Sequence, residues 1–277
     1  MNVTVAGVDG NPLASNIVAA QGPGGDGSVR VYNSRLPRPG ETPGTYSSFQ
    51  PYPGGSTGVV LAAGLVDAMS GRTSIITAPG AGVASWIKTF RNSLFHQASQ
   101  TRGGHPGHPG VTIGGSDPVR SWNEPDGAEP TWDETSSFVA FGADYLGGVG
   151  LSAGWVAGEL GGVQRIVARA RNTGEVIVYS SGSGLDGQPA AYAQSPTMHD
   201  ATVTFTPMAR FTPGPGAGVG TASTSTGADL LTTQAVGDTW AVVRYHLIRP
   251  APDARTLTPE RVAAVALSAG VPSLAGS

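Results

Sequence analysis

Two tryptophans and three carboxylates lie close together in one polar stretch of the sequence, SWNEPDGAEPTWDE at residues 121–134. The five residues are Trp122, Asp126, Trp132, Asp133 and Glu134. Carboxylates beside an aromatic platform can bind sugar hydroxyls, and two carboxylates can share general acid–base work in glycoside hydrolysis. Aromatic side chains are also enriched where proteins bind one another. We predict that this stretch contacts a protein partner or anchors a loop on the body, ahead of sugar binding or hydrolysis.

Other residues with suitable chemistry form no recognised catalytic or metal motif. His96, His105 and His108 lie near one another in the chain, and imidazole binds zinc, copper and nickel. Their H-P-G-H spacing is not that of a standard site, and the surrounding prolines and glycines predict an exposed loop. The sequence also lacks a P-loop and an H-E-x-x-H motif. We therefore predict no catalytic residues and a protein that is not an enzyme.

The composition argues against several classes of function. Only 13% of the 277 residues are charged and the net charge is -3, so the chain lacks the basic patch of a nucleic-acid-binding protein. No apolar run approaches the ~20 residues of a transmembrane helix. The chain has no cysteines, which leaves its redox compartment open. Nucleic acid is excluded as a partner, and no transmembrane segment is expected.

A polar but weakly charged surface favours an extracytoplasmic protein, at the cell surface, in the periplasm or secreted. The first ten residues, MNVTVAGVDG, lack the basic start and apolar core of a signal peptide. Export would then depend on a leader that has been removed or on a signal carried elsewhere.

Short apolar runs separated by glycine-rich turns predict β-strands throughout the chain. In the clearest segment the runs cover residues 59–66, 74–78 and 85–90. Runs of this length bounded by Gly, Ser, Asp or Pro are typical of buried strands, and a helix would not tolerate so many glycines. The same three runs recur, with middle strands beginning near residues 16, 74, 164 and 229. Such repetition of multi-strand units predicts a propeller or another repeat array.

These repeats resemble the blades of FG-GAP, or VCBS-type, proteins, the family of integrin-alpha-like β-propellers. The residues that carry the resemblance in the second unit are 58–64, 75–82 and 87–90, and they recur in the first unit at 17–25 and 29–32. Outer strands with the S-S-F pattern lie at 47–52 and 136–141. The match covers most of the chain apart from residues 92–135 and 250–277.

The resemblance implies an all-β fold, a β-propeller of about four blades that is closed, partial or irregular. The propeller would occupy residues 1–250, with a long insertion between strands at about 92–135. Residues 251–277 would form a tail with a short helix, because Thr258 is a good cap, Pro259 suits the first helical turn and Gly270 is a typical stop.

Blades of this family bind calcium in an acidic loop between the first two strands, so the resemblance also suggests metal ligands. The first unit retains Asp9 and Asn11, and the second retains Asp67. The third retains Glu159, and the fourth has Ser223, Ser225 and Asp229. No unit has the three carboxylates that would make a strong site for a hard cation. The alternative is that these residues form Asx turns.

The function expected from these features is a non-catalytic extracytoplasmic binding or scaffold module, a subunit or domain of a larger surface or periplasmic assembly. No cofactor is expected unless a calcium loop is functional. The alternatives are a calcium-dependent, lectin-like carbohydrate-binding propeller and, behind it, a glycoside-active hydrolase.

Overall fold

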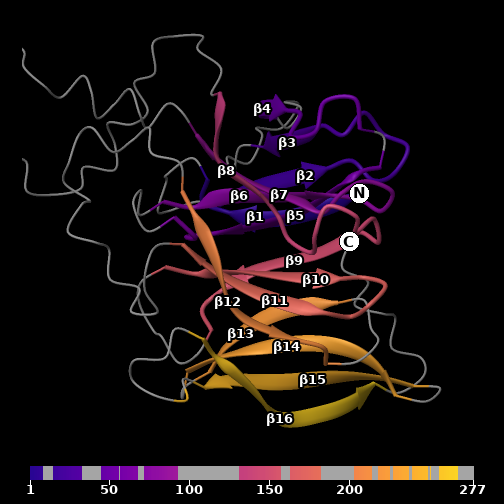
Figure 1. The fold of residues 1–277 in the computed structure, drawn as a ribbon. Helices are drawn as coiled ribbons and strands as arrows, with labels where there is room; N and C mark the ends of the chain where they lie inside the picture. Colours follow the sequence, from indigo (N-terminus) through magenta and orange to yellow (C-terminus); the bar gives the residue numbers. More distant parts are fainter. Residues whose placement is uncertain are drawn as a thin grey trace, which may run out of the picture.

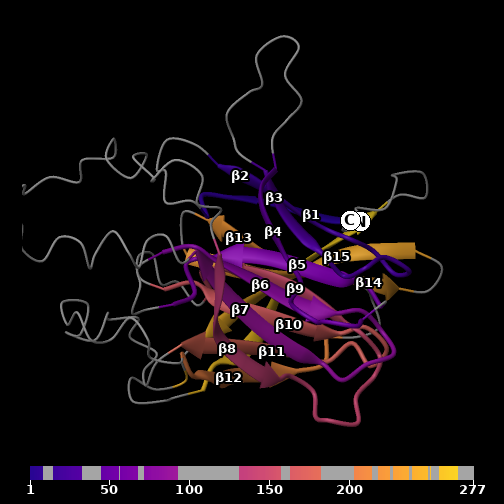
Figure 2. The ribbon, with the colours of Figure 1, turned by 90° about the horizontal axis from the view of Figure 1, so that it is seen from above.

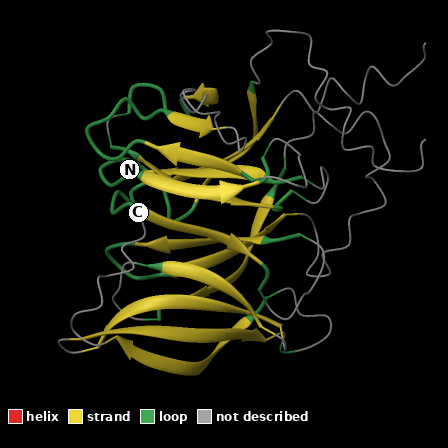
Figure 3. Ribbon diagram, turned by 180° about the vertical axis from the view of Figure 1, so that it is seen from behind, coloured by secondary structure: helices red, strands yellow, loops and turns green. Residues whose placement is uncertain are grey.

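The computed structural model describes the segments that form the sheets and the turns between them. These are residues 1–8, 15–32, 45–55, 57–67, 72–92, 131–156, 163–181, 203–213, 218–224, 227–236, 239–248, 250 and 256–267. All regular structure in these segments is β-strand (Figure 3). None of the described residues belongs to a helix with the length and apolar character needed to cross a membrane.

The described strands form four antiparallel sheets of four strands each (Figure 1). Sheet 1 contains β1 (Asn2–Ala6), β2 (Asn16–Ala20), β3 (Val29–Tyr32) and β4 (Thr45–Phe49). Sheet 2 contains β5 (Val59–Gly64), β6 (Ser74–Pro79), β7 (Trp86–Asn92) and β8 (Trp132–Val139). Sheet 3 contains β9 (Val149–Gly154), β10 (Arg165–Ala170), β11 (Val176–Ser181) and β12 (Phe205–Phe211). Sheet 4 contains β13 (Val219–Thr224), β14 (Gly227–Val236), β15 (Thr239–Ile248) and β16 (Thr258–Leu267).

Each sheet is a meander, so strands that follow one another in the chain are neighbours in the sheet. The first strands of the sheets lie beside one another: β5 contacts both β1 and β9, and β9 also contacts β13. The four sheets therefore stack face to face in the order of the sequence (Figures 1 and 2). We call the face that is turned toward the next sheet the forward face of a sheet, and the opposite face its backward face.

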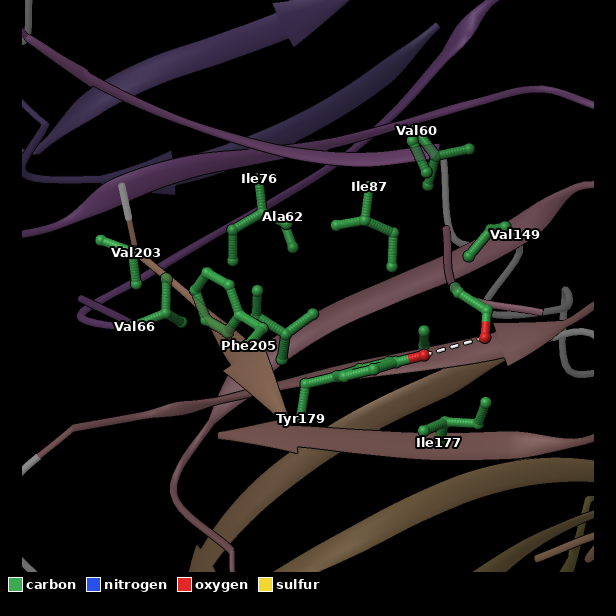
Figure 4. Packing of buried hydrophobic residues seen from close by; sticks show 14 residues of the cluster. Val60, Ala62, Val66, Ile76, Ile87, Val149, Ile177, Tyr179, Val203 and Phe205 are labelled. Atoms are coloured by element: carbon green, nitrogen blue, oxygen red, sulfur yellow. Dashed lines mark hydrogen bonds between the residues drawn. The ribbon is translucent and has the colours of Figure 1, made fainter. Parts of the chain in front are cut away.

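Three apolar layers fill the spaces between the four sheets. The layer between sheets 1 and 2 includes Val31 and Ile75. The layer between sheets 2 and 3, drawn in Figure 4, includes Ile76 and Phe205, and the layer between sheets 3 and 4 includes Leu230. Strands β6, β10 and β11 are buried at every residue because both faces of their sheets are covered. Strand β1 instead alternates between half-buried and exposed residues because only one face of sheet 1 is covered.

A pair of aromatic rings recurs in each of the three layers. The pairs are Phe49 with Phe90, Phe138 with Tyr179, and Phe211 with Tyr245, with ring centroids 4.7, 4.8 and 5.2 Å apart. In every pair the first ring lies on the fourth strand of one sheet and the second ring lies on the third strand of the next sheet. Tilted ring contacts of this kind stabilise a layer beyond the area that they bury.

A β-bulge also recurs in all four sheets, in the pairing of the third strand with the fourth. The register shifts occur at Val31/Tyr32, Thr89/Phe90, Val178/Tyr179 and Arg244/Tyr245. Each bulge immediately precedes the aromatic residue of the third strand. A bulge bends a strand and redirects its side chains, so this position in the repeat sets the direction of the ring.

The short helix predicted from residue 258 is wrong, because Thr258–Leu267 is the strand β16. The valines and alanines of this segment suit a strand as well as a helix. Strand β15 has backbone groups along its outer edge that need partners, and pairing with β16 places Val265 opposite Val242. Pro259 is tolerated because β16 is an edge strand. The residues expected to form a helix thus complete sheet 4.

One strand boundary also differs from the prediction. At the insertion, β7 extends to Asn92 and β8 begins at Trp132. Because antiparallel pairing continues to this point, with Asn92 opposite Trp132, the last residues of the predicted insertion belong to a strand. Residues 93–130 lie outside the described part of the chain.

Candidate contact surface on β7 and β8

Four residues lie along β7, β8 and the connection between β4 and β5, and we call them the β7–β8 surface. They are Tyr52, Trp86, Lys88 and Glu134. Lys88 Nζ lies 2.7 Å from Glu134 Oε2 and 5.6 Å from the centre of the Tyr52 ring. The Tyr52 hydroxyl donates a hydrogen bond of 2.9 Å to the Trp86 carbonyl, and Trp86 is 43% exposed. The surface thus presents an indole next to an ion pair.

The alternation of side chains along β7 explains why this surface forms. Ile87 and Thr89 are buried, so Trp86 and Lys88 lie on the other face of the strand. Strand β8 brings Glu134 opposite Phe90, within reach of Lys88. Tyr52 comes from the connection between β4 and β5, and its ring lies below Lys88 Nζ.

The charges on this surface would allow a ligand to take the place of Lys88 or of Glu134 in their ion pair. Burial raises the pKa of the Tyr52 hydroxyl far above its usual value, although its hydrogen bond with Thr77 acts in the opposite direction. The hydroxyl therefore remains a donor at neutral pH. The side chains of Lys88 and Glu134 are 21% and 40% exposed, and such pairs contribute only about 0–1 kcal/mol. A ligand could replace either charged partner at little cost.

The predicted site residues that the structure describes do not act together. Trp132 Nε1 donates a 2.7 Å hydrogen bond to Ser47 Oγ, and the Trp132 ring stacks on Phe49 with centroids 5.5 Å apart. Trp132 therefore anchors β8 on sheet 1. Asp133 and Glu134 are adjacent in a strand, so their carboxylates point to opposite faces and are not placed to act on one substrate. Trp122 and Asp126 lie outside the described residues.

Of the calcium ligands suggested by the family resemblance, two carboxylates are paired with cationic side chains and several other residues lie outside the described part of the chain. Asp67 is buried, with 1% of its surface exposed, and its Oδ2 lies 3.3 Å from Arg91 Nη1. Asp229 has both oxygens engaged, by His246 at 2.9 Å and by Arg244 at 3.3 Å. Within the described residues no group of three or more His, Asp or Glu side chains is arranged to hold a metal ion. Asp9, Asn11 and Glu159 lie outside the described part of the chain, as does Ser225.

The pattern G-x-S-x-G of serine hydrolases occurs twice, at residues 54–58 and 150–154. A nucleophile elbow requires a sharp turn from a strand into a helix. Residues 150–154 instead lie within β9, where Ser152 pairs with Val167, and Gly58 leads directly into β5. Neither occurrence has the context of an elbow.

Sequence reasoning missed most of the β7–β8 surface, although a signal was present. Trp86 and Lys88 alternate with the apolar Ile87 in the run SWIKTF, which predicts that they share the face away from the core. Tyr52 gave no such signal, because its position depends on how the connection after β4 packs against sheet 2.

No family model matches this sequence, and no curated protein matches it either.

Proposed function

We propose that the protein is a non-catalytic binding and scaffold module of an extracytoplasmic assembly, and that its four sheets are blades of a propeller-like arrangement. The arrangement is supported by the four sequential meanders and by the contacts among β1, β5, β9 and β13. The blades provide a rigid support, and the contact surface lies at one edge of that support.

The observation that carries the binding role is the exposed Trp86 beside the Lys88–Glu134 ion pair. Tryptophan is among the residues that dominate the binding energy of protein interfaces, and Lys88 and Glu134 place a charge of each sign beside it. The surface runs along the paired strands from Glu134, near the start of β8, to Trp86, which is the first residue of β7 and pairs with Val139 at the end of β8. We infer that a protein partner binds across this edge of sheet 2.

The test is the mass and subunit composition of the protein purified from its native source without denaturant. A defined complex with a second kind of chain is expected, and Trp86→Ala is expected to remove that chain. The matched control is Glu175→Gln, which breaks another partly exposed ion pair, to Arg210 on sheet 3, and should leave the complex intact. Recovery of this chain with no other protein would overturn the proposal.

Carbohydrate binding is the second candidate, because Trp86 and Glu134 together offer an aromatic platform and a hydrogen-bond acceptor. A glycan array would show binding that Trp86→Ala abolishes. The array should be run with and without calcium, because binding that requires calcium would support the lectin-like alternative and binding that persists under chelation would exclude it.

A further inference from the structure

The backward face of sheet 1 is an apolar surface that none of the other described sheets covers. We call it the sheet 1 end face. Val5 pairs with Ile17, and Ile17 pairs with Tyr32, so the three side chains lie on the same face of the sheet. Val3, Val5 and Ile17 are 38%, 63% and 46% exposed. The opposite face of the same sheet is buried against sheet 2 through Val18 and its neighbours.

The forward face of sheet 4 is a second apolar surface of this kind. We call it the sheet 4 end face. Trp240 and Ile248 lie on β15 and are 47% and 38% exposed, and Val265 on β16 is 64% exposed. Val265 pairs with Val242, which is half-buried on the same face. Asp229 and its partners Arg244 and His246 also lie on this face, at the positions that alternate with buried residues of β15.

These two faces are the unmatched halves of the interface that the chain repeats three times. In sheets 1 to 3, the third-strand residue three positions before the aromatic residue pairs with a phenylalanine on the fourth strand. These pairs are Val29 with Phe49, Ile87 with Phe138, and Val176 with Phe211. In sheet 4 the corresponding pair is Val242 with Val265. Val265 therefore occupies the position from which a forward face contacts the next sheet.

Tyr32 occupies the complementary position on the sheet 1 end face. It follows the recurring bulge, as Phe90, Tyr179 and Tyr245 do. Those three rings each contact a phenylalanine of the preceding sheet. Sheet 1 has no preceding sheet among the described residues, so Tyr32 meets no such ring there. Tyr32, in the first sheet, thus holds the position that contacts a preceding sheet. Val265, in the last sheet, holds the position that contacts a following sheet.

We propose that two copies of this chain associate head to tail, the sheet 4 end face of each packing on the sheet 1 end face of the other. We take the occupant to be a second copy because it carries the matching face. In the pair, a forward face packs on a backward face, as in the three internal interfaces, and Val265 of one copy lies on Tyr32 of the other. Head-to-tail contacts form rings when the rotation closes and filaments when it does not. Two copies contribute eight sheets, which is within the usual range of about four to eight blades for closed propellers.

This pairing does not depend on the proposed function, because the β7–β8 surface lies at the junction of sheets 1 and 2 and stays open in the pair. The two ideas therefore fail separately. Loss of a foreign partner after Trp86→Ala says nothing about pairing, and loss of pairing after a change at either end face says nothing about the partner.

Sedimentation equilibrium provides the first test. The expected mass at micromolar concentration is twice 27.9 kDa. Val5→Asp and Val265→Asp should each raise the dissociation constant at least about tenfold, because an unpaired carboxylate would be buried in the contact. Circular dichroism serves as the fold control, since both side chains are largely exposed in the single chain. A wild-type protein that remains monomeric even at ~100 μM would overturn the proposal.

Cross-linking tests the polarity of the contact, and the chain suits it because it has no cysteines. A mixture of Tyr32→Cys and Val265→Cys proteins should give a covalent dimer with a short bismaleimide. Each variant alone should give none, and neither should Val265→Cys mixed with Arg210→Cys, whose exposed position is on sheet 3. The double variant Tyr32→Cys/Val265→Cys should stop at a covalent dimer. Dimers from a single variant alone, or a ladder of larger species from the double variant, would contradict the closed pair.

Discussion

Single polar side chains tie neighbouring sheets together by reaching backbone carbonyls across the apolar layers. The Tyr179 hydroxyl donates a 2.9 Å hydrogen bond to the Ala140 carbonyl (Figure 4). Arg169, which is fully buried, donates from Nη1 to the carbonyls of Gly218 and Thr233 at 2.9 and 3.0 Å. A buried carbonyl left without a donor costs free energy, so these side chains fix how the sheets sit on one another.

The buried Tyr179 hydroxyl predicts how the stability of the fold changes at high pH. Burial raises the pKa of Tyr179 to about 12, whereas an unfolded tyrosine titrates near 10. The folded state therefore holds a proton that the unfolded state loses, and this contribution to stability is complete below pH 10 and disappears as pH rises toward 12.

The substitution Tyr179→Phe should lower the free energy of unfolding by about 1–2 kcal/mol at pH 7, because the Ala140 carbonyl loses its donor. The difference from wild type should shrink between pH 10 and pH 12, since the variant lacks the titrating group. Urea unfolding at pH 7 and pH 11, with tyrosinate absorbance recorded in parallel, measures both effects. A difference that is the same at the two pH values would show that Tyr179 does not titrate as described.

Arg169 should be among the most sensitive positions in the chain. Arg169→Met is expected to lower the free energy of unfolding by about 1.5–3 kcal/mol, because the partly buried carbonyls of Gly218 and Thr233 lose a charged donor. Urea unfolding at neutral pH is the measurement. Arg210→Met is the control, since the Arg210 side chain is 59% exposed and its ion pair with Glu175 should contribute less than about 1 kcal/mol. Equal effects of the two changes would contradict a structural role for Arg169.

Close approach of the backbone governs the start of sheet 2. Gly58 has a φ of 80° and leads into β5. A Cβ at this position would lie 2.6 Å from the Gly22 carbonyl carbon and from the Pro23 nitrogen. Both neighbours are backbone atoms in the turn after β2, which cannot move without disturbing sheet 1. Sheet 2 therefore depends on glycine at the point where it meets sheet 1.

A matched pair of glycine substitutions separates strain from collision. Gly54 has a φ of 78°, but a Cβ there would meet nothing within 4 Å. Gly54→Ala should cost about 1–2 kcal/mol for the left-handed backbone alone. Gly58→Ala should cost clearly more, because the collision adds to the same strain. Thermal unfolding of both variants gives the comparison, and similar melting temperatures would rule out the close contact.

Strand positions could be predicted from the sequence wherever apolar runs are short and flanked by turn residues. The continuous apolar run SIITA forms β6, whose two faces are both covered. The alternating run VRVY forms β3, of which one face is covered. The segment after Thr258 could not be assigned in this way, because RVAAVAL fits both periods and only the open edge of β15 decides between them. The site was harder to predict, since Asp133 and Glu134 are neighbours in sequence yet lie on opposite faces of β8.

The stack as a whole should be most stable at its centre. Sheets 2 and 3 are covered by another described sheet on both faces, whereas sheets 1 and 4 are each covered by a described sheet on one face only. Amide hydrogens of β6 and β10 should exchange most slowly, while those of β1 and β16 should exchange fastest, because local opening is easiest where few apolar contacts are lost.

Hydrogen exchange followed by mass spectrometry measures this gradient peptide by peptide. The monomeric variant Val265→Asp is the informative sample, because pairing in wild type would protect the end faces. Uniform protection across all four sheets of that variant would contradict the gradient.

Each sheet is also built from one uninterrupted stretch of chain that enters at the first strand and leaves from the fourth. None of the described strands comes from a distant segment to close another sheet. A duplication or deletion of one such stretch in the gene would therefore add or remove a complete sheet and leave the hydrogen bonding of the others unbroken. Architectures with this property can change length in whole units during evolution, and the recurring bulge and ring pair are the marks that such copying would leave.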